Sequence, residues 1–151
     1  MKKLISKKML YRFINFYPPF IGAGVKVRVL NDECSELEVS MKLTRFNKNY
    51  VGTHFGGSLY SMCDPFYMLI LMQHLGRDYL VWDKSASIDF RRPGRTKVKA
   101  HFKISKDRIK SIIDEVNELG KCEPIFNVDV LDENDKLVAT IEKKLWVKKK
   151  S

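Results

Sequence analysis

A carboxylate that follows a glycine-rich turn is the strongest chemical signal in this chain. Residues 49–64 read NYVGTHFGGSLYSMCD, so two adjacent glycines, Gly56 and Gly57, lead into an apolar stretch, and Asp64 lies seven residues after the second. Backbone N–H groups at a helix N-terminus bind anions, including the oxyanion of an acyl-transfer intermediate. A carboxylate two turns into an apolar helix is costly unless it is paired or used. The spacing therefore predicts an oxyanion-binding turn and a carboxylate that could act as a base.

Two polar side chains of the same segment are further candidates. Asn49 is a candidate for its polar amide, although Asn47 or Asn49 could simply cap the loop. His54 is a candidate site residue, and the alternative is a loop histidine that makes a structural hydrogen bond. Cys63 lies in an apolar stretch with no base nearby in the sequence, so we expect inert packing there. The candidate catalytic residues are Asp64, Gly56, Asn49 and His54.

The charge of the chain limits its partners. Its 151 residues include 28 Lys and Arg against 18 Asp and Glu, a formal net charge of +10. The basic residues are spread out, and no nucleic-acid-binding motif accompanies them, so we expect no nucleic-acid partner. A local cluster around a Pro-Gly turn could hold phosphate groups or simply form a solvated patch. It consists of Arg91, Arg92 and Arg95.

Hydrophobic periodicity predicts the elements that position these residues. Helical spacing predicts an amphipathic N-terminal helix within 1–20, ended by Pro18-Pro19, a long helix over 57–76 and a shorter one over 107–119. Alternation predicts strands over 25–29, 36–44, 79–92, 97–105, 122–131 and 136–148. Pro65 removes one backbone hydrogen bond, so the long helix should kink or tighten beside Asp64.

The order of these elements predicts one α+β domain over residues 1–151. We expect a single antiparallel sheet of about six strands wrapped around the long central helix, with the N-terminal helix as an addition. The long helix is apolar nearly all round, and one sheet covers only one side of it. The remaining apolar face predicts a symmetric homodimer or a dimer of dimers, a homotetramer.

Cysteine use and hydrophobicity bear on the compartment. Cys34, Cys63 and Cys122 are odd in number and lack metal-ligand spacing, which favours reduced thiols in a cytoplasmic protein without a metal site. No apolar run is long enough to span a membrane. The basic N-terminal helix has two interpretations: it packs on the edge of the domain, or it makes a weak contact with an anionic membrane surface.

Three short motifs carry a family resemblance: His-Phe-Gly-Gly at 54–57, Trp-Asp-Lys at 82–84 and Phe-Arg-Arg-Pro-Gly at 90–94. Together with the order of elements over residues 20–148, they resemble the hotdog fold, and within it the acyl-CoA thioesterases of the phenylacetyl-CoA thioesterase type. The chain is most similar to the branch called domain of unknown function 4442. The family turn reads His-Gly-Gly, whereas here Phe55 precedes the glycines and His54 lies one place earlier.

The resemblance implies roles for the candidates. Asp64 matches the carboxylate that acts as general base or nucleophile, Gly56 the glycine whose N–H polarises the thioester carbonyl, and Asn49 the residue that holds the thioester or the lytic water. In these enzymes the carboxylate and the glycine turn come from different subunits, so a homodimer would complete the site. The substrate would be an acyl-CoA, and its coenzyme A moiety makes a separate cofactor unnecessary. Candidate substrate-binding residues are Gly57, Ser85 (or Ser87), Arg91, Arg92 and Arg95.

Two other functions fit parts of the sequence. A dehydratase acting on acyl-carrier-protein substrates would place its acid further along the helix, about where Met68 and Leu69 lie, so their apolar side chains argue against it. A non-catalytic hotdog protein would bind acyl-CoA or lipid in a tunnel without turnover. Asp83 and Lys84 are either further site residues or an exposed ion pair.

Overall fold

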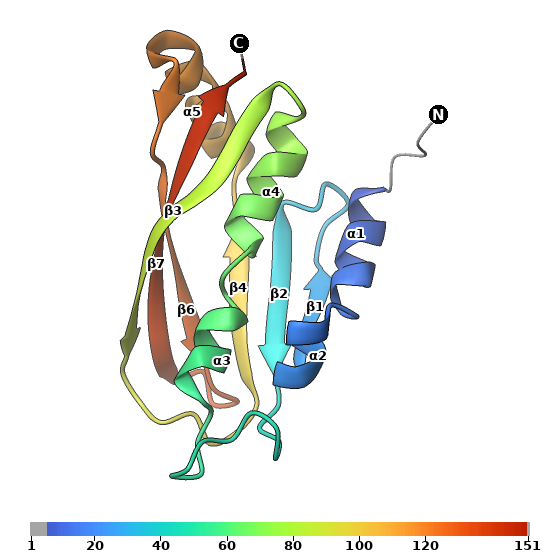
Figure 1. The fold of residues 1–151 in the computed structure, drawn as a ribbon, viewed down its shortest axis with the longest axis vertical. Coiled ribbons are helices and arrows are strands. Elements are labelled where there is room, and N and C mark those ends of the chain that lie inside the picture. The colour runs from blue at the N-terminus through green and yellow to red at the C-terminus, as the bar shows by residue number, and fades with distance from the viewer. Residues whose placement is uncertain (1–5, 151) are drawn as a thin grey trace.

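One antiparallel sheet of seven strands is the scaffold of the molecule. The computed structural model describes residues 6–150 (Figure 1). The strand order is β1-β2-β4-β6-β7-β3, and the short β5 pairs with β7 beside this path, so the expected count of about six differs only by a two-residue strand. The strands are β1 (Val25–Val29), β2 (Glu36–Met41), β3 (Tyr79–Phe90), β4 (Val98–Lys103), β5 (Lys121–Cys122), β6 (Ile125–Leu131) and β7 (Leu137–Lys149).

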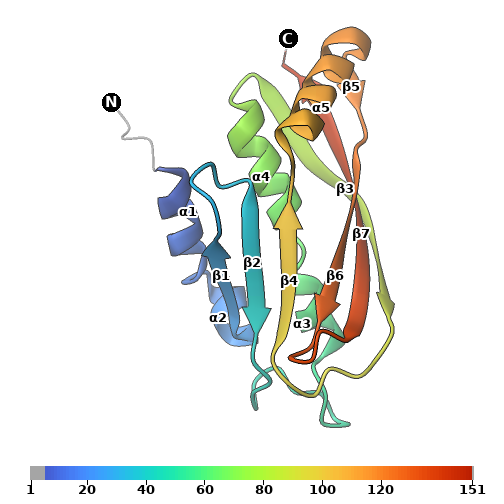
Figure 2. The ribbon, with the colours of Figure 1, turned by 180° about the vertical axis from the view of Figure 1, so that it is seen from behind.

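The predicted alternation gives this sheet one buried face. On β6, Phe126, Val128 and Val130 are buried while the residues between them are exposed, because successive strand side chains point to opposite faces. The buried face packs against two consecutive helices, α3 (Gly56–Ser61) and α4 (Phe66–Leu75). Figure 2 shows the sheet from the opposite face, where α5 (Lys106–Leu119) lies at one end. The central helix therefore covers only one side of the sheet.

The central helix is interrupted rather than merely kinked. The sequence predicts one helix over 57–76, whereas α3 ends at Ser61 and α4 begins at Phe66. The N–H of Cys63 donates to the carbonyl of Tyr60 at 2.8 Å, which is a tight i→i+3 turn, and Pro65 has no N–H to continue the ladder. The predicted disturbance at Pro65 is thus confirmed, and it places Asp64 in the break.

Aromatic packing fixes α4 on the sheet. The Tyr67 ring stacks on Phe126 with centroids 4.7 Å apart, and Phe66 contacts Phe102 at 5.2 Å. The Tyr67 hydroxyl donates to the carbonyl of Asn127 at 2.6 Å, which satisfies the one polar atom of this buried ring. Met72 on the same helix stays exposed, so the sheet does not cover all of its apolar surface.

The N-terminal segment forms two helices instead of one. These are α1 (Lys7–Ile14) and α2 (Pro18–Ala23), both beside β1 (Figure 1). The prediction treated Pro18-Pro19 as a stop, but proline also fits the first turn of a helix, because its missing N–H would have no partner there. Residues 1–5 of the predicted helix lie outside the described residues. Within residues 6–150, no helix has the length and apolar content needed to cross a membrane.

Candidate functional site

A pocket of about 400 Å³ gathers five of the predicted site residues. It lies where the loop before α3 meets the segment after β3. Leu59 and Phe90 give it an apolar wall, and two exposed arginines stand at its rim. The predicted residues that line it are Asn49, His54, Gly56, Arg91 and Arg92. The structure thus brings these segments together in one pocket, although they are separated by more than thirty residues in the chain.

The polar side chains of this loop are used to hold its shape. The amide Nδ2 of Asn49 donates to the hydroxyl of Thr53 at 2.9 Å, and its Oδ1 accepts from the Thr53 N–H at 2.9 Å. Asn47 is buried and donates to the carbonyls of Ala23 and Lys42 at 2.8 and 2.7 Å. Both asparagines thus tie the loop, as the alternative interpretation of Asn49 expected, and Asn49 also lines the pocket.

His54 is buried and bonded to the backbone. Its Nε2 lies 2.8 Å from the carbonyl oxygen of Thr96, so Nε2 carries the proton and donates it there. Nδ1 is buried without a hydrogen-bond partner among the described residues. Burial lowers the pKa of His54 from its usual 6.5, and the hydrogen bond to Thr96 opposes this shift. The side chain is neutral at physiological pH, while the neighbouring Phe55 is exposed.

Protonating His54 should therefore favour the unfolded chain. Because its pKa is lower in the folded state, its contribution to stability is complete above about pH 6.5 and is lost as the pH falls. We expect the free energy of unfolding to drop below this pH in the wild type and to drop less steeply in His54→Gln, whose amide keeps the bond to Thr96. Denaturant titrations at several pH values measure both slopes. His74, whose pKa burial also lowers, contributes equally to both proteins, so equal slopes would contradict the assignment.

The glycine turn needs small residues for reasons of space. A Cβ atom on Gly57 would lie 2.5 Å from the Phe55 ring, and one on Gly56 would lie 3.0 Å from the Phe90 ring. Gly56 is the first residue of α3, and no side chain caps this helix. Among residues 6–150, no acceptor pairs with the N–H of Gly56 or Gly57. These two N–H groups are therefore available to an anion or a carbonyl oxygen.

Asp64 belongs to a second cluster, which the pocket does not include. It faces Lys143 of β7, whose Nζ lies 2.8 Å from Asp64 Oδ1. The Tyr60 hydroxyl donates to the same oxygen at 2.8 Å. Asp83 Oδ1 lies 3.1 Å from Lys143 Nζ as an ion pair, but outside hydrogen-bond geometry. Two carboxylates, one ammonium group and one phenol thus meet beside the break in the central helix.

Lys143 is the residue that sequence reasoning missed. It is 1% exposed, the same as Tyr11 and Met41 in the hydrophobic core. Burial is the largest single influence on its pKa and lowers it, but the contacts with Asp64, Tyr60 and Asp83 together outweigh burial and raise the pKa above its usual 10.5. Burial raises the pKa of Asp83, and the same ammonium group opposes that rise. The signal was present in β7, where Lys143 occupies a place in the inward-facing row Ala139, Ile141, Lys143, Leu145 and Val147.

The other predicted residues lie outside both clusters. Ser85 is exposed on β3, next to a register shift between Asp83 and Ser85, and neither Arg95 nor Gly57 lines the pocket. Asp83 and Lys84 do not form the exposed ion pair considered above, because Asp83 faces Lys143 and Lys84 pairs with Glu123. Their side chains point in opposite directions from adjacent positions on the strand.

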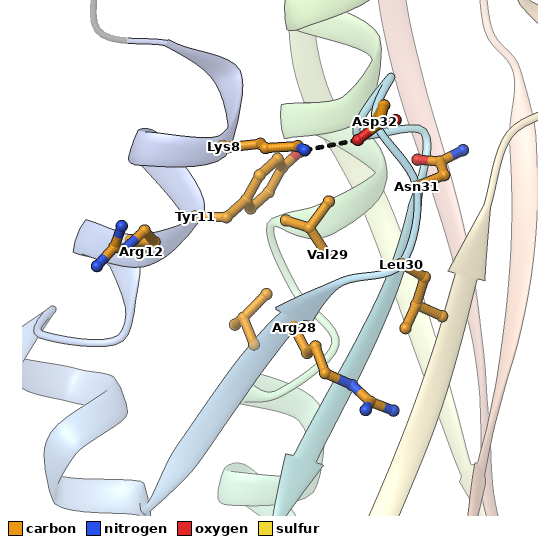
Figure 3. A pocket seen from close by; sticks show the side chains of 9 residues that line it. Lys8, Tyr11, Arg12, Arg28, Val29, Leu30, Asn31 and Asp32 are labelled. Atoms are coloured by element: carbon orange, nitrogen blue, oxygen red, sulfur yellow. Dashed lines mark hydrogen bonds and ion pairs between the residues drawn. The ribbon is translucent and has the colours of Figure 1, made fainter.

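Neither thiols nor metal ligands form an alternative centre. Cys63 is fully buried, and burial raises the pKa of its thiol, which agrees with inert packing. Within residues 6–150, no group of three or more His, Cys, Asp and Glu side chains could hold a metal ion. A larger hollow of about 470 Å³ lies between α1 and β1, where an ion pair joins Lys8 and Asp32 at 2.6 Å (Figure 3). None of the predicted site residues lines it.

A helix packed into one face of a single antiparallel sheet, with a glycine turn at its start, defines a hotdog-fold protein. The chain belongs to the family described as domain of unknown function (DUF4442), whose pattern matches residues 5–147. No curated protein matches it.

Several solved structures share this fold at low sequence identity. PA5026 of Pseudomonas aeruginosa, described as a protein of unknown function and "Probable Thioesterase", is 18% identical, with a TM-score of 0.82 over 96% of this chain and 97% of its own. Thioesterase HI1161 of Haemophilus influenzae is 16% identical, with a TM-score of 0.69 over 98% and 94%. The PaaI protein of the Escherichia coli phenylacetic acid degradation operon is 14% identical, with a TM-score of 0.61 over 99% and 97%. At these identities, the likeness concerns the fold.

Proposed function

We propose that the protein is an acyl-CoA thioesterase. The observation that supports this best is that the chain carries two incomplete sites. One is a pocket lined by arginines and by the glycine turn with its free N–H groups, and the other holds a carboxylate oriented by hydrogen bonds. Hydrolysis of a thioester needs an oxyanion donor and a base for water, and these two sites supply them separately. The thioesterase names of HI1161 and PA5026 agree with this proposal.

The proposed reaction uses residues of this chain only. Asp64 takes a proton from water as the water oxygen bonds to the thioester carbon, and the N–H of Gly56 stabilises the resulting oxyanion. The C–S bond then breaks, and the coenzyme A thiolate leaves and receives the proton that Asp64 took from water, which regenerates the carboxylate. Arg91 and Arg92 contact the phosphate groups of coenzyme A, because both are exposed at the pocket rim.

The distance between the two sites favours a homodimer. Gly56 lies at the start of α3, and Asp64 lies eight residues later in the break between α3 and α4. Asp64 does not line the pocket that contains Gly56, and in a twofold dimer the carboxylate of one chain can meet the glycine turn of the other. β3 lies at the end of the strand order and pairs only with β7, so its outer edge is available to a second copy. The proposed compartment is the cytoplasm, since all three cysteines are free thiols.

A binding protein without turnover is the second candidate. The observation that favours it is the position of His54, which is buried and bonded to Thr96, while the exposed Phe55 occupies the place of the family histidine. Such a protein would hold an acyl-CoA or lipid in the same pocket.

A panel of acyl-CoAs with short, medium, long and aromatic acyl groups separates the two candidates. Release of free thiol, detected with a thiol reagent, supports hydrolysis. Native mass spectrometry of the purified protein detects a retained acyl ligand. Binding of acyl-CoA without thiol release from any member of the panel would contradict the thioesterase and favour the binding protein.

A further inference from the structure

Both donors that reach Asp64 bind the same carboxylate oxygen. The hydroxyl of Tyr60 and the ammonium group of Lys143 each lie 2.8 Å from Oδ1. Oδ2 has no hydrogen-bond partner within residues 6–150, and the side chain is 45% exposed. The carboxylate is thus fixed from one side only, and its second oxygen faces outward.

Burial of Lys143 has a cost that only its contacts offset. An ammonium group removed from water needs nearby negative charge, and here Asp64 and Asp83 both supply it. Its Nζ also lies 5.5 Å from the centre of the Tyr60 ring and 3.3 Å from the Tyr60 hydroxyl. The more buried Asp83 lies 3.1 Å from this ammonium group but makes no hydrogen bond with it. The hydrogen bond that joins Lys143 to a carboxylate is therefore the one with the more exposed Asp64, at 2.8 Å.

We propose that Lys143 and Tyr60 are positioning residues that hold Asp64 by Oδ1 so that Oδ2 is presented to the water that attacks the substrate. This inference rests on the proposed thioesterase function. Asp83 forms a second ion pair with Lys143 at 3.1 Å, which helps to keep the ammonium group in place. Neither Lys143 nor Tyr60 needs to touch the substrate, because the misplacement of a base by about 1 Å lowers a rate by about a hundredfold.

Lys143→Met tests this arrangement, since it keeps the length of the side chain and removes the charge. We expect kcat to fall about tenfold to a hundredfold while KM changes less than about twofold, because orientation and not substrate binding is lost. Lys143→Arg should restore part of the rate.

Lys144→Met is the matched control, because Lys144 is the next residue on β7 and faces the other side of the sheet. Tyr60→Phe gives a second test that leaves the buried ammonium group in place, in case Lys143→Met fails to fold. An active wild type whose kcat is unchanged in Tyr60→Phe and in a folded Lys143→Met would overturn the inference alone. A wild type that hydrolyses no acyl-CoA would overturn the proposed function and this inference with it.

An independent observation concerns α1 and α2, which expose an apolar patch. The patch consists of five residues, each at least 42% exposed, and four of them lie after the first turn of α1. The buried face of α1, with Tyr11, packs on the domain, so this patch is a second apolar face. We call Met9, Phe13, Phe16, Tyr17 and Ile21 the α1–α2 patch.

The charge around the α1–α2 patch identifies a partner. Lys7 and Arg12 are exposed on α1 and have no ion-pair partner among residues 6–150, whereas the exposed Lys8 pairs with Asp32. No acidic residue occurs between Ser6 and Asn31. Exposed aromatic residues beside basic ones favour the interface of an anionic bilayer, where rings enter the headgroup region and cations meet acidic lipids. We infer that the α1–α2 patch binds the surface of an anionic membrane.

Sedimentation with lipid vesicles tests this surface. We expect at least about tenfold stronger binding to phosphatidylcholine vesicles containing about 30% phosphatidylglycerol than to phosphatidylcholine alone. The double variant Phe13→Ser/Phe16→Ser should lose at least about tenfold of this binding, because two rings leave the interface. Leu119→Ser, which removes an exposed apolar side chain at the end of α5, is the control. If the double variant sediments with the vesicles as strongly as the wild type, the inference is overturned. A lower oligomeric state of the double variant, measured by light scattering, would also overturn it and would assign the patch to contact with a second copy.

Discussion

Asp64→Asn lowers kcat/KM for the preferred acyl-CoA by about a thousandfold, because a neutral amide cannot accept a proton from the attacking water. The replacement keeps the shape of the side chain, and its amide oxygen still accepts hydrogen bonds from Tyr60 and Lys143. Asp83 continues to face the buried ammonium group at 3.1 Å, so the fold is expected to survive. Steady-state release of free thiol measures the effect.

The control for this prediction is Asp114→Asn. Asp114 is an exposed acid on α5 that pairs with Lys110, so its loss changes the net charge equally without touching the site. Thermal unfolding of both variants shows whether each is folded at the assay temperature. If a folded Asp64→Asn protein keeps its rate within about threefold of the wild type, Asp64 is not the base.

The second large effect concerns the division of the site between two chains. Gly56→Pro removes the proposed oxyanion donor, and proline suits the first position of α3 because Phe55 already has extended backbone angles, φ −62° and ψ 129°. Alone, Gly56→Pro and Asp64→Asn should each be inactive. A randomly mixed population of the two should regain about a quarter of the wild-type activity, because half of the dimers are mixed and each of these has one intact site.

Co-expression with two different affinity tags gives such a population, and thiol release measures the recovery. The doubly purified fraction contains mixed dimers only, so it should reach about half of the wild-type activity. Gly56→Ala is the matched control, since it adds a Cβ atom at the same place, 3.0 Å from the Phe90 ring, but keeps the N–H. A Gly56→Ala protein as inactive as Gly56→Pro would assign the loss to crowding. No recovery in the mixed dimers would place a complete site within one chain.

Periodicity predicted the fold well because each element carries a local signal. Alternation along 25–29 and 97–105 reports a sheet with one buried face, and β1 and β4 form there. The interruption of the central helix followed from a single residue, Pro65, whose missing N–H acts locally. The division of the N-terminal segment was missed, because proline both ends one helix and begins another, and only packing on β1 decides between them.

The sequence predicted only part of the candidate site, because motifs identify its segments but do not show which residues of those segments contact one another. The glycine turn and the arginines at 91–92 line one pocket, as their types suggested. The hydrogen bond of His54 could not be predicted from the neighbouring sequence, because its partner Thr96 is 42 residues away. Lys143 was missed for the same reason, since its partners Asp64 and Asp83 come from the helix break and from β3. A lysine in an inward row of a strand is nevertheless a signal that sequence reading can use.

The unpaired edge of strand β3 affects the solubility of a single chain that is not assembled with a second copy. β3 is twelve residues long, and its exposed side chains include Leu80, Trp82 and Phe90. A long apolar edge with free N–H and C=O groups is a template on which other unpaired strands add. Dilute or newly synthesised single chains should therefore precipitate before they accumulate as monomers. Two exposed charges of this strand, Lys84 and Asp89, and the register shift between Asp83 and Ser85 are the features of that edge that slow such growth.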